Sequence, residues 1–157
     1  GLFSLQGALN HSMLYLGMGH DSARGRLALD SRDKVEVHWP NVRQEPIFQT
    51  IQNTMRAHAQ AAGGDYLSPT SVPILKERAI TTVHPLGGCR MGQDARYGVV
   101  DHRGRVFDPS RGAGAVHAGL YVADAAIIPT ALGVNPLLVI SALAERIADH
   151  ALANREV

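Results

Sequence analysis

The chain has 157 residues, of which 45% are hydrophobic and 18% are charged. This length and composition predict about one globular domain and exclude an intrinsically disordered chain. The 15 lysines and arginines balance 14 acidic residues and are scattered, so neither a nucleic-acid-binding nor an anionic-membrane surface is indicated. The single cysteine excludes an internal disulfide framework and a multi-cysteine zinc site.

The sequence shows no targeting segment. No apolar run approaches the roughly 20 residues of a membrane-spanning helix, so we expect a soluble protein. Residues 1–4, Gly-Leu-Phe-Ser, carry neither an initiator methionine nor the charged start of a signal peptide. We therefore expect the chain to be part of a longer protein, and we favour the cytoplasm over secretion.

The first half of the chain predicts antiparallel strands and one helix. The apolar run Met13–Leu16 indicates a short strand. Apolar residues alternate with small or polar ones in residues 27–29 and 35–37, on either side of a polar turn at 31–33, which is typical of a half-buried hairpin. From Glu45 to Ala62 the apolar residues recur every third or fourth position, which predicts a helix.

Glycine and proline mark the end of that helix and the start of the second half. Gly63-Gly64 supplies the expected helix stop, because glycine accepts the left-handed conformation. Residues 68–73 then predict a surface connector between two lobes. The β-branched run from Ile80 to Val83 is predicted to deliver His84 to a strand end.

The second half predicts two further strand regions and a long helix. Residues 98–101 and 105–108 could form a hairpin around His102–Gly104, and the apolar run Leu120–Ala123 suits a strand buried on both faces. The helix signal is the strongest in the chain. Asn135 is a favoured N-cap and Pro136 a favoured first helical residue, and apolar residues then keep helical spacing to residue 151.

Two segments could carry chemistry. The first, residues 83–92, places His84 before a proline and two glycines, Gly87 and Gly88, that would let another molecule approach the backbone. A histidine held in this way suits proton transfer near neutral pH. The alternative is a capped turn in which the histidine donates to a carbonyl group.

The second segment joins the apolar run that ends at Asp124 to the helix that starts at Asn135. The unpaired amide groups of a helix N-terminus attract a phosphate, a carboxylate or a developing anion. The alternative is an ordinary strand–loop–helix connection in which Asn135 is only a cap. Both alternatives stay open at this point.

Together these segments resemble the C-terminal part of the glucose-methanol-choline (GMC) flavoprotein oxidoreductases. The resemblance is carried by His-Pro-Leu-Gly-Gly-Cys at 84–89, by residues 119–124 and by residues 133–146, and it extends from about residue 80 to 151. The family has a cholesterol-oxidase-like branch and a choline-dehydrogenase branch. This chain is more similar to the first, both in the sequence of residues 84–89 and in Gly-Val-Asn-Pro-Leu-Leu at 133–138.

The resemblance implies an enzyme that binds FAD and transfers a hydride from an alcohol carbon to the flavin. It implies that His84 handles the hydroxyl proton and that Asn135 hydrogen-bonds the substrate oxygen, as the two catalytic residues. It also implies an FAD-binding set, which consists of Gly87, Gly88, Asp124, Ala125, Asn135, Pro136 and Leu137. The substrate would be an alcohol, and a sterol-like one is among the candidates.

One family feature is missing. Enzymes of this type hold the FAD pyrophosphate with a G-x-G-x-x-G turn, and this sequence has none. We therefore predict an α+β fragment. Residues 1–79 would belong to a substrate-binding lobe with an antiparallel sheet and a helix, and residues 80–157 would supply the active-site loop and the strand and helix that complete an FAD-binding lobe. The N-terminal FAD-binding lobe would be its partner.

The absence of the pyrophosphate-binding turn affects what the isolated chain can do. Without that lobe, the isolated chain is predicted to bind FAD weakly or not at all, to show no turnover, and to expose an apolar face through which it could self-associate. A non-catalytic module that binds an apolar ligand, or that is purely structural, is the alternative function. The eight histidines, including the pairs His11 and His20 and His102 and His117, lack metal-ligand spacing, so most are expected to be solvated or capping. Cys89 is expected to be a small buried thiol.

Overall fold

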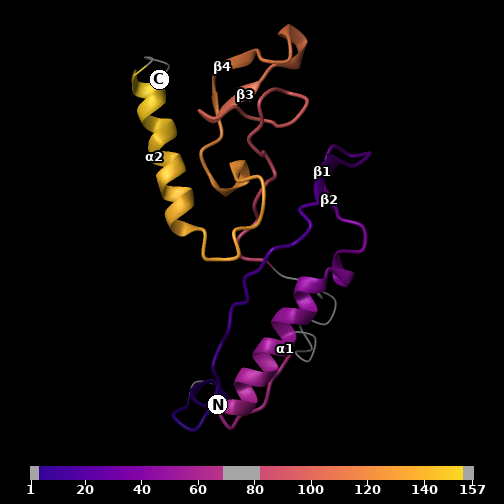
Figure 1. The fold of residues 1–157 in the computed structure, drawn as a ribbon, viewed down its shortest axis with the longest axis vertical. Helices are drawn as coiled ribbons and strands as arrows, with labels where there is room; N and C mark the ends of the chain where they lie inside the picture. The colour runs from indigo at the N-terminus through magenta and orange to yellow at the C-terminus, as the bar shows by residue number, and fades with distance from the viewer. Residues whose placement is uncertain (1–3, 69–81, 154–157) are drawn as a thin grey trace.

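The computed structural model describes residues 4–68 and 82–153 (Figure 1). In chain order the described strands and helices are β1 (Arg26–Leu29), β2 (Val35–His38), α1 (Pro46–Ala61), β3 (Arg105–Phe107), β4 (Val116–Tyr121) and α2 (Leu137–Ala153). Short 3₁₀ helices occupy Ala8–His11, Val42–Gln44, Pro109–Arg111 and Ala125–Ile127. Strands β1 and β2 form one antiparallel sheet and β3 and β4 another, so the predicted α+β class is confirmed.

The predicted hairpin is confirmed as β1 and β2. Leu27 lies opposite Val37 and Leu29 opposite Val35, so the four apolar side chains share one face. Asp30 closes the turn by accepting two backbone N–H groups. The predicted half-burial is wrong, because these side chains are 53–69% exposed and nothing in the described part of the chain covers most of that face.

Helix α1 is confirmed within a residue of each predicted end. Pro46 is its first residue, where a missing N–H costs nothing. The chain leaves the helix through Gly63, whose φ of 72° lies in the left-handed region that glycine accepts most readily.

The predicted strand at Met13–Leu16 is wrong. Residues 12–25 have no regular secondary structure and run beside α1 (Figure 1). Gly17 lies so close to the helix that a β-carbon there would come within 2.3 Å of Ile51 Cγ2. The neighbour of this segment is therefore a helix, which offers no backbone groups for strand pairing.

Residues 69–81 lie outside the described residues, and they hold most of the predicted connector and the first half of the β-branched run from 80 to 83. Thr82 and Val83 are described and belong to no strand. The predicted strand end before His84 is therefore absent at the two described positions.

The predicted hairpin in the second half is confirmed in part. The turn is present, because Asp101 donates its backbone N–H to the Arg105 carbonyl at 3.0 Å and Val100 bridges Val106. The extended partner of β3 is, however, β4, which begins at Val116 rather than at Leu120. Burial of residues 120–123 on both faces is also wrong, since Leu120 is 49% exposed in a two-stranded sheet.

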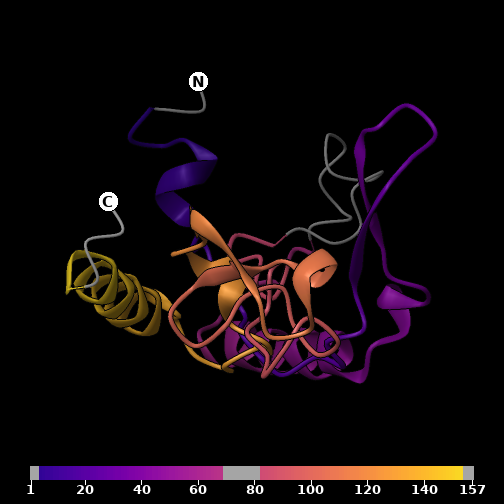
Figure 2. The ribbon, with the colours of Figure 1, turned by 90° about the horizontal axis from the view of Figure 1, so that it is seen from above.

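Helix α2 and the loops beside it share the main core. Val100, Ile127, Ile128 and Ile147 are at most 3% exposed and pack together. Figures 1 and 2 both show α2 along one flank of the β3–β4 half of the molecule. No helix within residues 4–68 or 82–153 is long and apolar enough to cross a membrane.

Candidate functional site

Backbone hydrogen bonds hold the loop after His84 against the loop after Asp124. Cys89 donates its N–H to the Ala126 carbonyl and Met91 donates to the Ile127 carbonyl, each at 2.9 Å. These bonds bring together the two segments that the sequence singles out, although they are almost 40 positions apart. We call this pair of contacts the backbone clamp.

The two glycines of the first loop fit closely against other parts of the chain. Gly87 has a φ of 78°, and a β-carbon there would lie 3.3 Å from the Ile128 carbonyl oxygen. A β-carbon on Gly88 would lie 3.1 Å from Leu27 Cδ1 in β1. The loop therefore touches both the Asp124 loop and the first hairpin, and larger residues at these positions would disturb both contacts.

His84 is half-buried at the start of this loop. Its backbone N–H donates to Thr82 Oγ1 at 3.2 Å. Within the described part of the chain its imidazole makes no hydrogen bond, so the alternative in which it donates to a carbonyl has no support there.

Asn135 caps the first turn of α2. Its Oδ1 accepts the Leu137 N–H at 3.0 Å, as the sequence predicts. The next residue, Pro136, is fully buried. Because this bond fixes the carboxamide oxygen on the helix, the Nδ2 amide group is the donor that Asn135 can offer to another partner, and it makes no hydrogen bond within the described residues.

The surroundings of Asn135 are apolar and exposed. Val134 and Leu137 are 63% and 65% exposed, and Leu138 is 80% exposed. Helix α2 thus begins with a polar N-terminus set in an uncovered apolar rim, which suits a flat ligand with one polar edge.

Asp124 caps the short 3₁₀ helix at Ala125–Ile127. Its Oδ1 accepts the Ala126 N–H at 2.8 Å, and the residue is exposed. Ala125 is half-buried. The carboxylate keeps its second oxygen for another donor, since no other hydrogen bond reaches it from the described residues.

The structure joins the loops that carry the predicted residues but does not pair their side chains. Within the described residues no hydrogen bond links His84 to Asn135. Their shared action on one substrate therefore stays a prediction.

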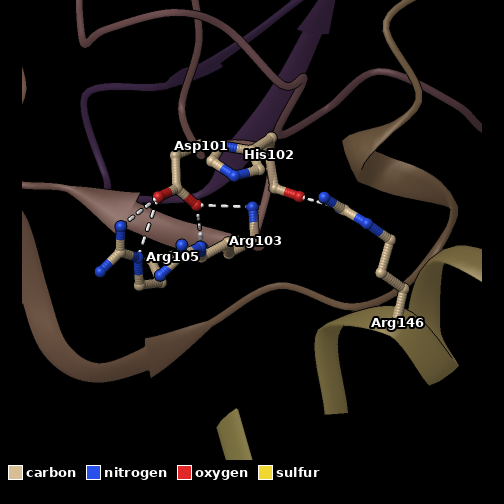
Figure 3. Close-up of polar contacts among 5 residues, drawn as sticks. All are labelled: Asp101, His102, Arg103, Arg105 and Arg146. Atoms are coloured by element: carbon tan, nitrogen blue, oxygen red, sulfur yellow. Dashed lines mark hydrogen bonds and ion pairs between the residues drawn. The ribbon is translucent and has the colours of Figure 1, made fainter. Parts of the chain in front are cut away.

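A polar network that the sequence analysis missed fixes the turn between Val100 and β3 (Figure 3). Asp101, 7% exposed, accepts the backbone N–H groups of Arg103 and Arg105 at 2.8 and 3.0 Å. It also accepts Nε and Nη2 of Arg105 at 2.9 and 2.7 Å. Burial raises the pKa of Asp101, but the hydrogen bonds from Arg105 and Arg103 outweigh burial and leave the pKa lowered.

Helix α2 is attached to this turn by two adjacent residues. Arg146 donates from Nη1 to the His102 carbonyl (Figure 3). Ile147 packs on Gly104, where a β-carbon would lie 2.7 Å from Ile147 Cδ1. The turn therefore helps to fix the helix whose N-terminus carries Asn135. A sequence signal exists only for the turn itself, since Asp–x–Arg–Gly is typical of one.

The described residues contain no cluster of side chains suited to a metal ion. No group of three or more His, Cys, Asp or Glu side chains within 4–68 and 82–153 could hold an ion. Cys89 is a free thiol and is half-buried rather than buried as predicted.

The chain is similar to several oxidases and to a dehydrogenase over part of their length. It is 34% identical to a cholesterol oxidase of Mycobacterium tuberculosis over 128 residues, which is 80% of this chain and 20% of that protein. It is 37% identical to a long-chain-alcohol oxidase of Arabidopsis thaliana over 44% of this chain and 8% of that protein. It is 29% identical to an oxygen-dependent choline dehydrogenase of Proteus mirabilis over 86% of this chain and 26% of that protein.

The chain thus spans about a fifth of the length of the cholesterol oxidase that it matches. No solved structure matches it significantly. The family model for GMC oxidoreductase matches residues 21–144, which include both clamped loops and Asn135. The chain therefore belongs to the GMC oxidoreductase family, as its resemblance predicts.

Proposed function

We propose that the protein carrying this chain is an FAD-dependent oxidoreductase that acts on alcohols, and that this chain supplies its proton-handling residues. The observation that carries the proposal is the hydrogen bonding of the Asn135 carboxamide. Its oxygen accepts the hydrogen bond of the α2 cap while its amide group makes no hydrogen bond within the described residues, and α2 follows the Asp124 loop that the backbone clamp joins to the His84 loop.

The residues present fit a flavin. The first-turn amide groups of α2 favour a partly negative polar edge, and the exposed side chains of Val134, Leu137 and Leu138 favour a flat apolar ring system. The proposed binding set is Gly87, Gly88, Asp124, Ala125, Asn135, Pro136 and Leu137. FAD, when bound, would supply the acceptor for the hydride.

His84 is proposed to accept the hydroxyl proton of the substrate. Loss of a hydride from an alcohol carbon is easier when the O–H proton leaves, and a neutral imidazole within hydrogen-bond reach lowers that barrier. The imidazole has no competing hydrogen bond within the described residues, so either ring nitrogen can be the unprotonated acceptor.

Asn135 is proposed to donate from Nδ2 to the same substrate oxygen. Because Oδ1 is fixed by the Leu137 N–H, rotation of the carboxamide would break the helix cap. The donor is therefore oriented before the substrate arrives, and it needs no reorganisation as negative charge grows on the oxygen.

The substrate is proposed to be an apolar alcohol. Two relatives are named for cholesterol and for long-chain alcohols. In this chain, Leu27 of β1 touches the Gly88 loop, and a shallow hollow on the hairpin is lined by Leu27, Ala28, Leu29 and Val35. This apolar surface begins at the loop that carries His84. We propose that the alkyl part of the substrate lies on it.

The rest of the protein is proposed to supply the pyrophosphate-binding turn, because this chain lacks it. We expect the isolated chain to bind FAD weakly and to show no turnover. A stoichiometric flavin spectrum from the purified chain would contradict this expectation.

The proposed activity is tested with the FAD-bound protein that carries this chain. Under anaerobic conditions, sterols, aliphatic alcohols and sugars are added in turn and the flavin absorbance is followed. We expect bleaching with a sterol or a long aliphatic alcohol and none with the matching ketone or alkane. A protein that binds FAD but is reduced by no alcohol would contradict the proposal and favour the non-catalytic alternative.

A further inference from the structure

His20 lies at the contact between the first half of the chain and the loop that carries Asn135. Gly17 and Gly19, which come shortly before His20 in the chain, pack closely against α1. A β-carbon on Gly19 would lie 2.3 Å from Ile47 Cδ1, as one on Gly17 would from Ile51 Cγ2. Only glycine allows so close an approach, so α1 fixes the backbone on the N-terminal side of His20.

The backbone on the C-terminal side of His20 is fixed as well. Ser22 donates its N–H to Glu45 Oε2 at 3.2 Å and its hydroxyl to Glu45 Oε1. Glu45 directly precedes α1. The Ser22 hydroxyl lowers the pKa of Glu45 below its ordinary value, because it donates a hydrogen bond to the charged form of the carboxylate. His20 is thus held from both sides on the first turns of α1.

The imidazole of His20 contacts Gly133. A β-carbon built on Gly133 would lie 2.7 Å from His20 Nε2 and 3.1 Å from Cδ2. The ring occupies the space that a side chain would need, and the Gly133 φ of 69° also favours glycine. His20 is therefore not simply solvated, as its sequence context suggests, although the residue is exposed overall.

We propose that His20 is a positioning residue for Asn135. Gly133 is two residues before Asn135, so the ring restrains the loop from one side while the Asn135–Leu137 hydrogen bond restrains it from the other. The consequence is that the Nδ2 donor is held in one place relative to the His84 loop. This inference rests on the proposed function for its catalytic consequence, but the restraint itself does not depend on it.

The test compares His20→Ala with His20→Phe in the FAD-bound protein that carries this chain. Phenylalanine keeps a flat ring over Gly133 and removes both nitrogens. His11→Ala is the matched control, because His11 is also an exposed histidine and its side chain makes no hydrogen bond within the described residues. Hydrogen exchange of the Val134, Asn135 and Leu137 amides and the rate of flavin reduction are measured for each variant.

We expect His20→Ala to speed exchange at these amides and to slow flavin reduction about 10- to 100-fold, the scale of a misplaced catalytic group, at unchanged FAD content. His20→Phe and His11→Ala should stay close to the parent protein in both measurements. Unchanged exchange in His20→Ala, or equal defects in the alanine and phenylalanine variants, would overturn the proposal. If no alcohol reduces the parent protein, the proposed function fails, while exchange still decides the role of His20.

A double-mutant comparison tests the contact itself. Gly133→Ala should destabilise the parent protein through both the backbone strain and the collision with the His20 ring. In the His20→Ala background only the backbone strain remains, so the loss of stability should be smaller. An equal loss in both backgrounds would overturn the contact on which the inference depends.

Discussion

The Cys89 backbone N–H donates to the Ala126 carbonyl at 2.9 Å, and this bond joins the loop that follows His84 to the loop that follows Asp124. It is one of the two bonds of the backbone clamp, and neither involves a side chain. The main chain therefore keeps the two loops together without engaging the His84 imidazole, which makes no hydrogen bond within the described residues.

His84→Gln should leave the FAD-bound protein folded and lower the rate of flavin reduction by an alcohol about 10²-fold or more, which is the usual contribution of a general base. The measurement is anaerobic stopped-flow reduction at saturating substrate. His102→Gln is the control, because only the backbone carbonyl of His102 takes part in a hydrogen bond in the described structure. Equal rates for His84→Gln and the parent protein would remove His84 from the mechanism.

Asp101→Asn should destabilise the folded protein by about 1.5–3 kcal/mol at pH 7, the range for hydrogen bonds to a charged group. The folded-state pKa of Asp101 lies below its unfolded value, which is about 3.9. Its stabilisation is therefore fully present above about pH 3.9 and is lost as the pH falls through the lower, folded-state pKa.

The measurement for Asp101 is the thermal midpoint of the parent and variant proteins at a series of pH values. The two midpoints should differ at pH 7 and converge in strong acid. The control is Asp149→Asn on the exposed surface of α2. Its thermal midpoint should equal that of the parent protein at each pH, because Asp149 has no hydrogen-bond partner among the described residues. A difference for Asp101→Asn that persists unchanged below its folded pKa would contradict the account.

Gly104→Ala should destabilise the protein more than Gly119→Ala, although the two glycines have nearly equal φ values of 74° and 70°. Left-handed strain costs each variant about 1–2 kcal/mol. A β-carbon on Gly104 would also lie 2.6 Å from the Val122 carbonyl oxygen, whereas one on Gly119 would meet nothing within 4 Å. This overpacking should add about 1–3 kcal/mol. Equal unfolding free energies for the two variants would show that the turn does not press on its neighbours.

The elements that the sequence predicts correctly depend on local signals. Asn135 and Pro136 start α2, Gly63 ends α1, and the turn at Asp30 closes the first hairpin, all through contacts within a few positions. Such signals are readable because capping and turn formation use neighbouring backbone groups.

The wrong predictions concern partners that are distant in sequence. Met13–Leu16 has the composition of a strand but lies beside α1, and the bounds and burial of β4 depend on its pairing with β3. The His20–Gly133 contact joins positions more than a hundred residues apart. No local sequence pattern predicts this contact, because both residues have the sequence context of ordinary loop residues.

The central claim, that the α2 cap orients a donor for the substrate oxygen, is tested most directly by Asn135→Asp. Aspartate keeps an acceptor for the Leu137 N–H and so keeps the cap, but it has no amide group to donate. We predict an FAD-bound protein with unchanged thermal stability whose reduction by alcohol is slower by about 10²- to 10³-fold, the cost of one lost donor. Reduction of Asn135→Asp at the parent rate would contradict the account.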